Sequence, residues 1–91
     1  ELKWHIAQLV PRLPLDPHEL QEVWSILSYW AQNPNESKIV RVNSLQGLFD
    51  IAIDHPAFKV SLQNILDTVE LEPIPSLIAR IKKLRRLLEH E

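Results

Sequence analysis

The feature that most constrains the fold is an internal repeat. A shift of 39 residues superimposes the chain on itself with 10 identities in 52 aligned positions. The matched residues include Pro17 with Pro56, Pro34 with Pro73, Ser37 with Ser76, and Arg41 with Arg80. Unrelated amphipathic helices share Leu and Ile readily, but chance rarely places Pro, Ser and Arg in one common register. The register therefore predicts tandem copies of one unit, and a period of about 40 residues is typical of helical repeats.

Each copy is predicted to contain two helices. The first type begins at a proline, which suits an opening turn because its missing N–H needs no partner there. Asp16 precedes Pro17 as a candidate N-cap, and Glu19 follows three residues later, as in a capping box. The second type begins at a serine cap, Ser37 or Ser76. Apolar residues follow helical spacing in both types: Leu20, Val23, Trp24, Leu27 and Ala31 in one, and Val42, Leu45, Leu48, Phe49 and Ala52 in the other.

The opening segment, residues 2–13, reads as a helix of the second type that lacks a first-type partner, and Pro11 is expected to bend or end it. We therefore expect an all-α fold of five helices, alternating between the second and the first type. Short turns would make neighbours antiparallel. The chain is expected to form one domain over residues 1–91, with a half repeat at 2–13 and repeats at 17–52 and 56–89. Because it contains no Met, we expect it to be a fragment of a longer protein.

The openings of the second-type helices carry a family resemblance. One copy reads Ile39-Val40-Arg41 with Leu45 and Leu48, and the other reads Ile78-Ala79-Arg80 with Leu84 and Leu87. A helix pair of this length with these openings resembles the HEAT and armadillo repeats. The resemblance covers the whole chain as an architecture, and it implies a right-handed α-α superhelix of stacked hairpins.

Helical spacing also bears on the two repeated arginines. Arg41 lies in line with Leu45 and Leu48, inside the apolar arc, and Arg80 lies likewise beside Leu84. A guanidinium on a packed face needs a partner or a route to solvent. We therefore expect a structural role for both arginines, in preference to ligand binding.

The resemblance adds an expectation about the partners of these arginines. In such repeats the arginine typically joins a ladder of polar contacts with an acidic residue of a turn between helices. Glu36 or Glu72 is the candidate partner here. The slot equivalent to Arg41 in the first unit is Leu2, so the ladder is expected to stop there.

Charge is unevenly distributed along the chain. Residues 1–75 carry five Lys/Arg and ten Asp/Glu, whereas residues 76–91 carry five Lys/Arg and two Asp/Glu. The candidate partner- or anion-binding residues of the last helix are Lys82, Lys83, Arg85 and Arg86. This basic side is interpreted first as a solvated outer face, then as a protein contact, then as a nucleic-acid contact. The acidic remainder would repel phosphates, and no aromatic residue is interleaved for base stacking.

The remaining residues show no pattern typical of a catalytic or metal-binding site. Tyr29 points away from the apolar stripe of its helix, so we expect it to be exposed, either as an interface anchor or as an ordinary surface residue. Gly47 lies inside a predicted helix and is expected to permit close helix approach. Asp54-His55-Pro56 is interpreted as a helix boundary. The histidines stand far apart and there is no Cys, so no catalytic, cofactor or metal site is predicted, and the chain is not expected to be an enzyme.

The sequence thus predicts a non-catalytic protein–protein interaction or scaffolding module. Its partner would be the rest of the parent chain, another protein, or a second copy bound through the exposed end helices. The alternative is a nucleic-acid-binding module, similar to alkylpurine DNA glycosylases, that uses the basic last helix; a third is a repeat domain attached to an enzyme. No apolar run reaches the roughly 20 residues of a membrane span and no signal peptide is recognisable, so a cytoplasmic location is expected.

Overall fold

The computed structural model describes residues 2–90 of the chain. Within this range there are five α-helices, two 3-10 helices and no strand. The elements are α1 (Leu2–Leu9), η1 (Val10–Arg12), α2 (Pro17–Gln32), α3 (Lys38–Asp54), η2 (Pro56–Phe58), α4 (Lys59–Glu70) and α5 (Pro75–Glu89). The prediction of an all-α chain with five helices is confirmed. None of these helices has both the length and the apolarity needed to cross a membrane.

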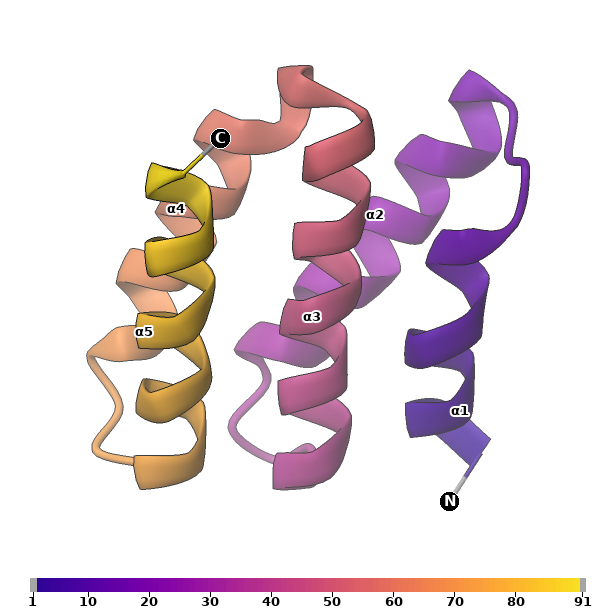
Figure 1. Ribbon diagram of the computed structural model, residues 1–91. Coiled ribbons are helices and arrows are strands. Elements are labelled where there is room, and N and C mark those ends of the chain that lie inside the picture. The colour runs from indigo at the N-terminus through magenta and orange to yellow at the C-terminus, as the bar shows by residue number, and fades with distance from the viewer. Residues whose placement is uncertain (1, 91) are drawn as a thin grey trace.

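The helices form two layers (Figure 1). Helices α1, α3 and α5 lie side by side and run in the same direction, while α2 and α4 cross behind them. Helix α3 is central, because it contacts α1, α2, α4 and α5. The molecule is a flat slab of 35 × 33 × 16 Å. The alternation of the two helix types along the chain thus becomes an alternation between two layers.

Two of the predicted helix caps are present and one is not. Asp16 accepts a hydrogen bond from the Glu19 backbone and Glu19 reciprocates, which forms the predicted capping box. Ser37 caps α3, as predicted. Ser76 does not cap α5: the helix begins one residue earlier, at Pro75, and the N-cap position is taken by Ile74 without a side-chain bond. Proline is well suited to the first position of a helix, and this places Ser76 inside the first turn.

The other prolines act close to where they were expected. Helix α1 ends at Leu9, and the chain continues through Pro11 as the tight turn η1. Pro56 was expected to open an α-helix, but it opens η2, and α4 begins only at Lys59. His55 terminates α3 by donating its backbone N–H to Ile51 O, as the helix-boundary interpretation predicted.

The core fills the space between the two layers. Its buried apolar residues come from every α-helix: Ala7, Leu20, Trp24, Leu27, Ala31, Leu45, Leu48, Phe49, Ile51, Ala52, Leu62, Ile65, Leu66, Val69, Leu77, Ile81 and Leu84. Gly47 sits at the closest approach of α3 to α1. A Cβ there would lie 2.9 Å from Ala7 O and 3.0 Å from Pro11 Cγ, so the absence of a side chain lets the two helices touch.

The packing does not follow the 39-residue register in the first-type helices. Under that shift Ile26 matches Ile65, yet Ile26 is 48% exposed and Ile65 only 7%. A shift of 38 instead matches buried residues with each other: Trp24 with Leu62, Leu27 with Ile65, and Ala31 with Val69. Each residue turns a helix by about 100°, so a one-residue offset moves every side chain to a different face. The identity of Ile26-Leu27 with Ile65-Leu66 therefore does not show that these residues occupy equivalent positions.

Candidate functional site

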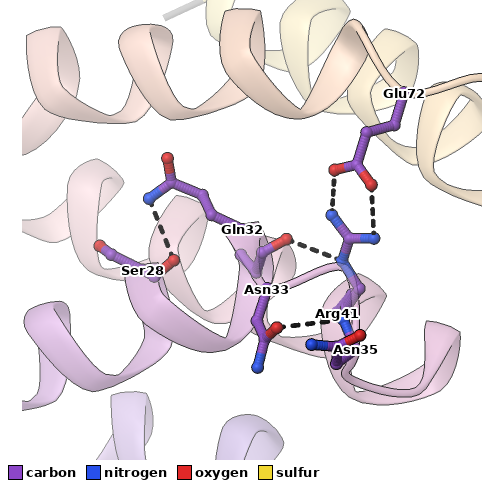
Figure 2. Close-up of polar contacts among 7 residues, drawn as sticks. Ser28, Gln32, Asn33, Asn35, Arg41 and Glu72 are labelled. Carbon is purple, nitrogen blue, oxygen red and sulfur yellow. Dashed lines mark hydrogen bonds and ion pairs between the residues drawn. The ribbon is translucent and has the colours of Figure 1, made fainter.

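The best-defined polar centre of the molecule surrounds Arg41. Its side chain is 1% exposed, and its Nε donates a hydrogen bond of 3.0 Å to the backbone oxygen of Ala31. Nη1 donates to Glu72 Oε1 at 3.0 Å, and Nη2 donates to the other carboxylate oxygen of Glu72. Figure 2 shows these two parallel hydrogen bonds, with Glu72 facing the guanidinium from the turn between α4 and α5. Of the two expected partners, Glu72 is the one that Arg41 uses.

This ion pair holds three separate parts of the chain together. Arg41 belongs to α3, Ala31 to the end of α2, and Glu72 to the connection at residues 71–74. The hydrogen bond from Arg41 lowers the pKa of Glu72 below its usual range, against the opposing effect of burial. The carboxylate is therefore charged at neutral pH and compensates a cation that has left water.

A second contact of the same kind lies one unit earlier. Lys3, near the start of α1, donates to Glu36 Oε2 at 2.7 Å, and Glu36 lies in the connection between α2 and α3. This hydrogen bond lowers the pKa of Glu36. The expectation that the ladder stops at Leu2 is wrong, because the neighbouring residue Lys3 makes the contact. A shift of 38 residues, in place of 39, aligns Lys3 with Arg41.

Arg80 does not repeat the environment of Arg41. The buried face of α5 consists of Leu77, Ile81 and Leu84, so Arg80 lies at its edge and is only partly buried. Its Nη1 donates to Gln46 Oε1 at 2.7 Å. The expectation that Arg80 faces the packed side as Arg41 does is therefore wrong. Helix α3 packs against α1, α2, α4 and α5, whereas α5 packs against α3 and α4, so a narrower side of α5 is buried.

The four candidate residues of the basic helix fall into two groups. Arg85 forms ion pairs with Asp67 and Glu70 of α4, so its charge is neutralised inside its own hairpin. Lys82, Lys83 and Arg86 are exposed. Lys82 and Arg86 are four residues apart and share one side of α5, whereas Lys83 lies on a neighbouring side. The structure therefore does not bring the four cations together as one cluster.

The end of the molecule formed by residues 2–32 exposes four large apolar residues, Ile6, Leu9, Leu13 and Ile26, which we call the apolar face. Beside it is a pocket of about 140 Å³ whose lining is apolar throughout: Ile6, Val10, Val23, Ile26, Leu27 and Trp30. Tyr29, one helical turn from Ile26, is 66% exposed, as the sequence predicted.

The sequence analysis expected the exposed end helix of residues 2–13 to bind a partner, but it did not name the four residues of the apolar face as a candidate site. The 39-residue shift matches Ile26 with the buried Ile65, so the repeat gave no indication that Ile26 is exposed. A signal was nevertheless present. Residues 2–13 were recognised as a half repeat, and Ile6, Leu9 and Leu13 recur in them at the spacing of one helix face.

Titratable residues elsewhere are dispersed. In residues 2–90 no group of three or more His, Cys, Asp or Glu side chains is placed to hold a metal ion. His18 pairs with Glu22 at 2.6 Å on the surface of α2, and His5 stacks on Trp4. These contacts are ordinary for exposed helical surfaces.

Comparison of the chain with protein-family models, with curated proteins and with solved structures gives no match. The resemblance to HEAT and armadillo repeats therefore rests on the second-helix openings and on the alternation of the helices between two layers.

Proposed function

We propose that this chain is a non-catalytic protein–protein interaction module, built from HEAT-like hairpins and binding its partner through the apolar face. The observation that carries the proposal is that two exposed residues of that face, Ile6 and Ile26, come from different helices and line one apolar pocket. Single exposed apolar residues are normal, whereas several of them around an apolar pocket are typical of an interface. Leu9 follows Ile6 by one helical turn on α1, and Leu13 follows η1 in extended conformation.

The shape of this surface favours a helical partner. Within residues 2–90, α3 and α5 each follow a first-type helix, but α1 has none before it. Residues of α1, of η1 and of α2 line this pocket together, as neighbouring helices line the grooves that receive the apolar side of an amphipathic helix. Tyr29 stands at the margin, where an aromatic ring can extend the contact. The helix would come from another segment of the parent protein, from a second copy or from a different protein.

A surface substitution tests this proposal. A photo-reactive amino acid at position 29 should crosslink to a partner, which is then purified and titrated against the chain. We expect Ile26→Glu to weaken that binding at least tenfold, because a carboxylate would be buried against apolar groups. Lys82→Glu is the matched control on the opposite end and should bind normally. If Ile26→Glu folds and binds as the parent does, the apolar face is not the interface.

Nucleic-acid binding by the last helix is the alternative, and the geometry favours it less. Of its four cations, Arg85 is already paired with Asp67 and Glu70. The remaining three are spread over two sides of α5. The first 75 residues of the chain carry ten Asp/Glu and only five Lys/Arg. Salt-dependent binding to duplex DNA that is lost on reversing Lys82, Lys83 and Arg86 together would support this alternative.

A further inference from the structure

A second pocket, polar and separate from the apolar face, lies where α1, α3 and α5 run side by side (Figure 1). Its volume is about 200 Å³, and its lining includes Arg12, Gln46, Asp50 and Arg80. Neither the repeat nor the hydrophobic core requires two guanidinium groups at one pocket. The pocket is smaller than the roughly 300–1,000 Å³ typical of metabolite sites, so it suits a single functional group.

Hydrogen bonds fix the orientation of the polar groups around this pocket. Arg80 Nη1 donates to Gln46 Oε1 at 2.7 Å, and Gln46 Nε2 donates to Asp50 Oδ1 at 3.1 Å. Across the pocket, Gln8 Nε2 donates to Asn43 Oδ1 at 3.3 Å. The Gln46 amide is thereby held in one orientation, and Arg80 is anchored by only part of its guanidinium. In the described part of the chain the Arg12 side chain makes no hydrogen bond or ion pair with another residue.

The charge of the lining selects the kind of ligand. Two arginines face one aspartate, which leaves one positive charge in excess. Asp54 belongs to a neighbouring depression that it shares with Arg12 and Asp50. A single excess charge suits a monoanion, whereas a polyanion would also meet the acidic body of the chain. Guanidinium groups bind carboxylates through paired, charge-assisted hydrogen bonds.

We propose that this pocket binds the carboxylate of an acidic side chain, held between Arg12 and Arg80. The source of that side chain is a partner protein, so this part of the inference rests on the proposed function. The pocket then supplies a polar contact at the layer of α1, α3 and α5, in addition to the apolar contact at the end of the molecule.

Nuclear magnetic resonance of the arginine Nε–H groups and of the Gln46 amide tests the site directly. The probe is N-acetyl-glutamic acid α-amide, and its neutral counterpart is N-acetyl-glutamine α-amide, at constant ionic strength. We expect saturable shifts for Arg12, Arg80 and Gln46 with the glutamate probe alone. Arg80→Gln should weaken binding at least tenfold and Arg80→Lys less, whereas Lys82→Gln should leave it unchanged.

Three results would overturn the inference. Equal shifts with the glutamine probe would exclude recognition of a carboxylate. Non-saturating shifts that include the exposed Arg86 would mean general ion association. Tighter binding of inorganic phosphate would replace a carboxylate site with a phosphate site. The Ile26→Glu variant should keep this titration unchanged, so failure of the apolar face and failure of this pocket can be told apart.

Discussion

The openings of α3 and α5 are two copies of one sequence motif in two different environments. Both read Ser-x-Ile-x-Arg, but Arg41 is enclosed and paired with a carboxylate, whereas Arg80 is partly buried and donates to a neutral amide. Further along, Leu48 is fully buried and its copy Leu87 is 43% exposed. Helix α3 has neighbours on both sides in its layer and α5 has one. In a stack of helices, the neighbours decide what a repeated residue does.

The largest expected effect comes from removing the carboxylate at the enclosed copy. Glu72→Ala leaves the Arg41 guanidinium buried without a counter-charge, which should lower the free energy of unfolding by about 3 kcal/mol. Urea denaturation measures this. Glu70→Ala is the control, because it removes a carboxylate of the same α4–α5 hairpin whose partner Arg85 is partly exposed. Equal losses in the free energy of unfolding for the two variants would show that the burial of Arg41 does not increase the contribution of its ion pair to stability.

Replacing Arg41 itself should lower the free energy of unfolding less than Glu72→Ala does, because Glu72→Ala leaves the charge of Arg41 unpaired. Arg41→Met removes the cation and keeps most of the volume, and Glu72 lies near enough to water to be solvated. We expect a loss of about 1–2 kcal/mol, and a larger loss for Arg41→Ala because a cavity is added. Arg41→Ala should also lower the melting temperature more than Lys59→Ala does. A melting temperature for Arg41→Ala at or above that of Lys59→Ala would contradict this ranking.

The acidic partners of the ladder should make stability depend on pH. The pKa values of Glu72 and Glu36 are lowered in the folded state by hydrogen bonds from Arg41 and Lys3 respectively. Their contribution is therefore complete above the unfolded-state pKa of about 4.3 and is lost as the pH falls through the lower folded-state values. Melting curves between pH 7 and pH 3 should show this decline. It should be shallower in Glu72→Gln, and an unchanged slope would exclude Glu72 as its source.

The sequence was informative wherever local chemistry decides the structure. The capping residues Asp16 and Ser37, the break at Pro11 and the alternation of two helix types all follow from patterns of a few residues. The partner of Arg41 was narrowed to two glutamates, because the resemblance to HEAT and armadillo repeats implies an acidic partner in a turn between helices.

What the sequence did not yield depends on helix rotation and on neighbours. The identities favoured a shift of 39, whereas the first-type helices pack in a register of 38, and this difference concealed the exposure of Ile26. Lys3 was missed because the 39-residue shift matches Leu2, and not Lys3, with Arg41. The position of Arg80 at the edge of the buried side of α5 likewise depends on the contacts of α5 with α3 and α4. The polar pocket requires three helices to be placed at once, so no single segment carries a signal for it.

The smallest expected effect lies at the less buried copy of the motif, Arg80. Arg80→Ala removes one hydrogen bond to Gln46 at a partly solvated site, and the Gln46 amide can exchange that bond for water. We expect a change of at most about 0.5 kcal/mol in the free energy of unfolding, measured beside Arg41→Ala under the same conditions. A loss as large as that of Arg41→Ala would mean that the repeated arginine stabilises its helix regardless of burial. A small loss in the free energy of unfolding would show that Arg80 contributes little to stability. That result is consistent with the ligand-binding role proposed for its pocket.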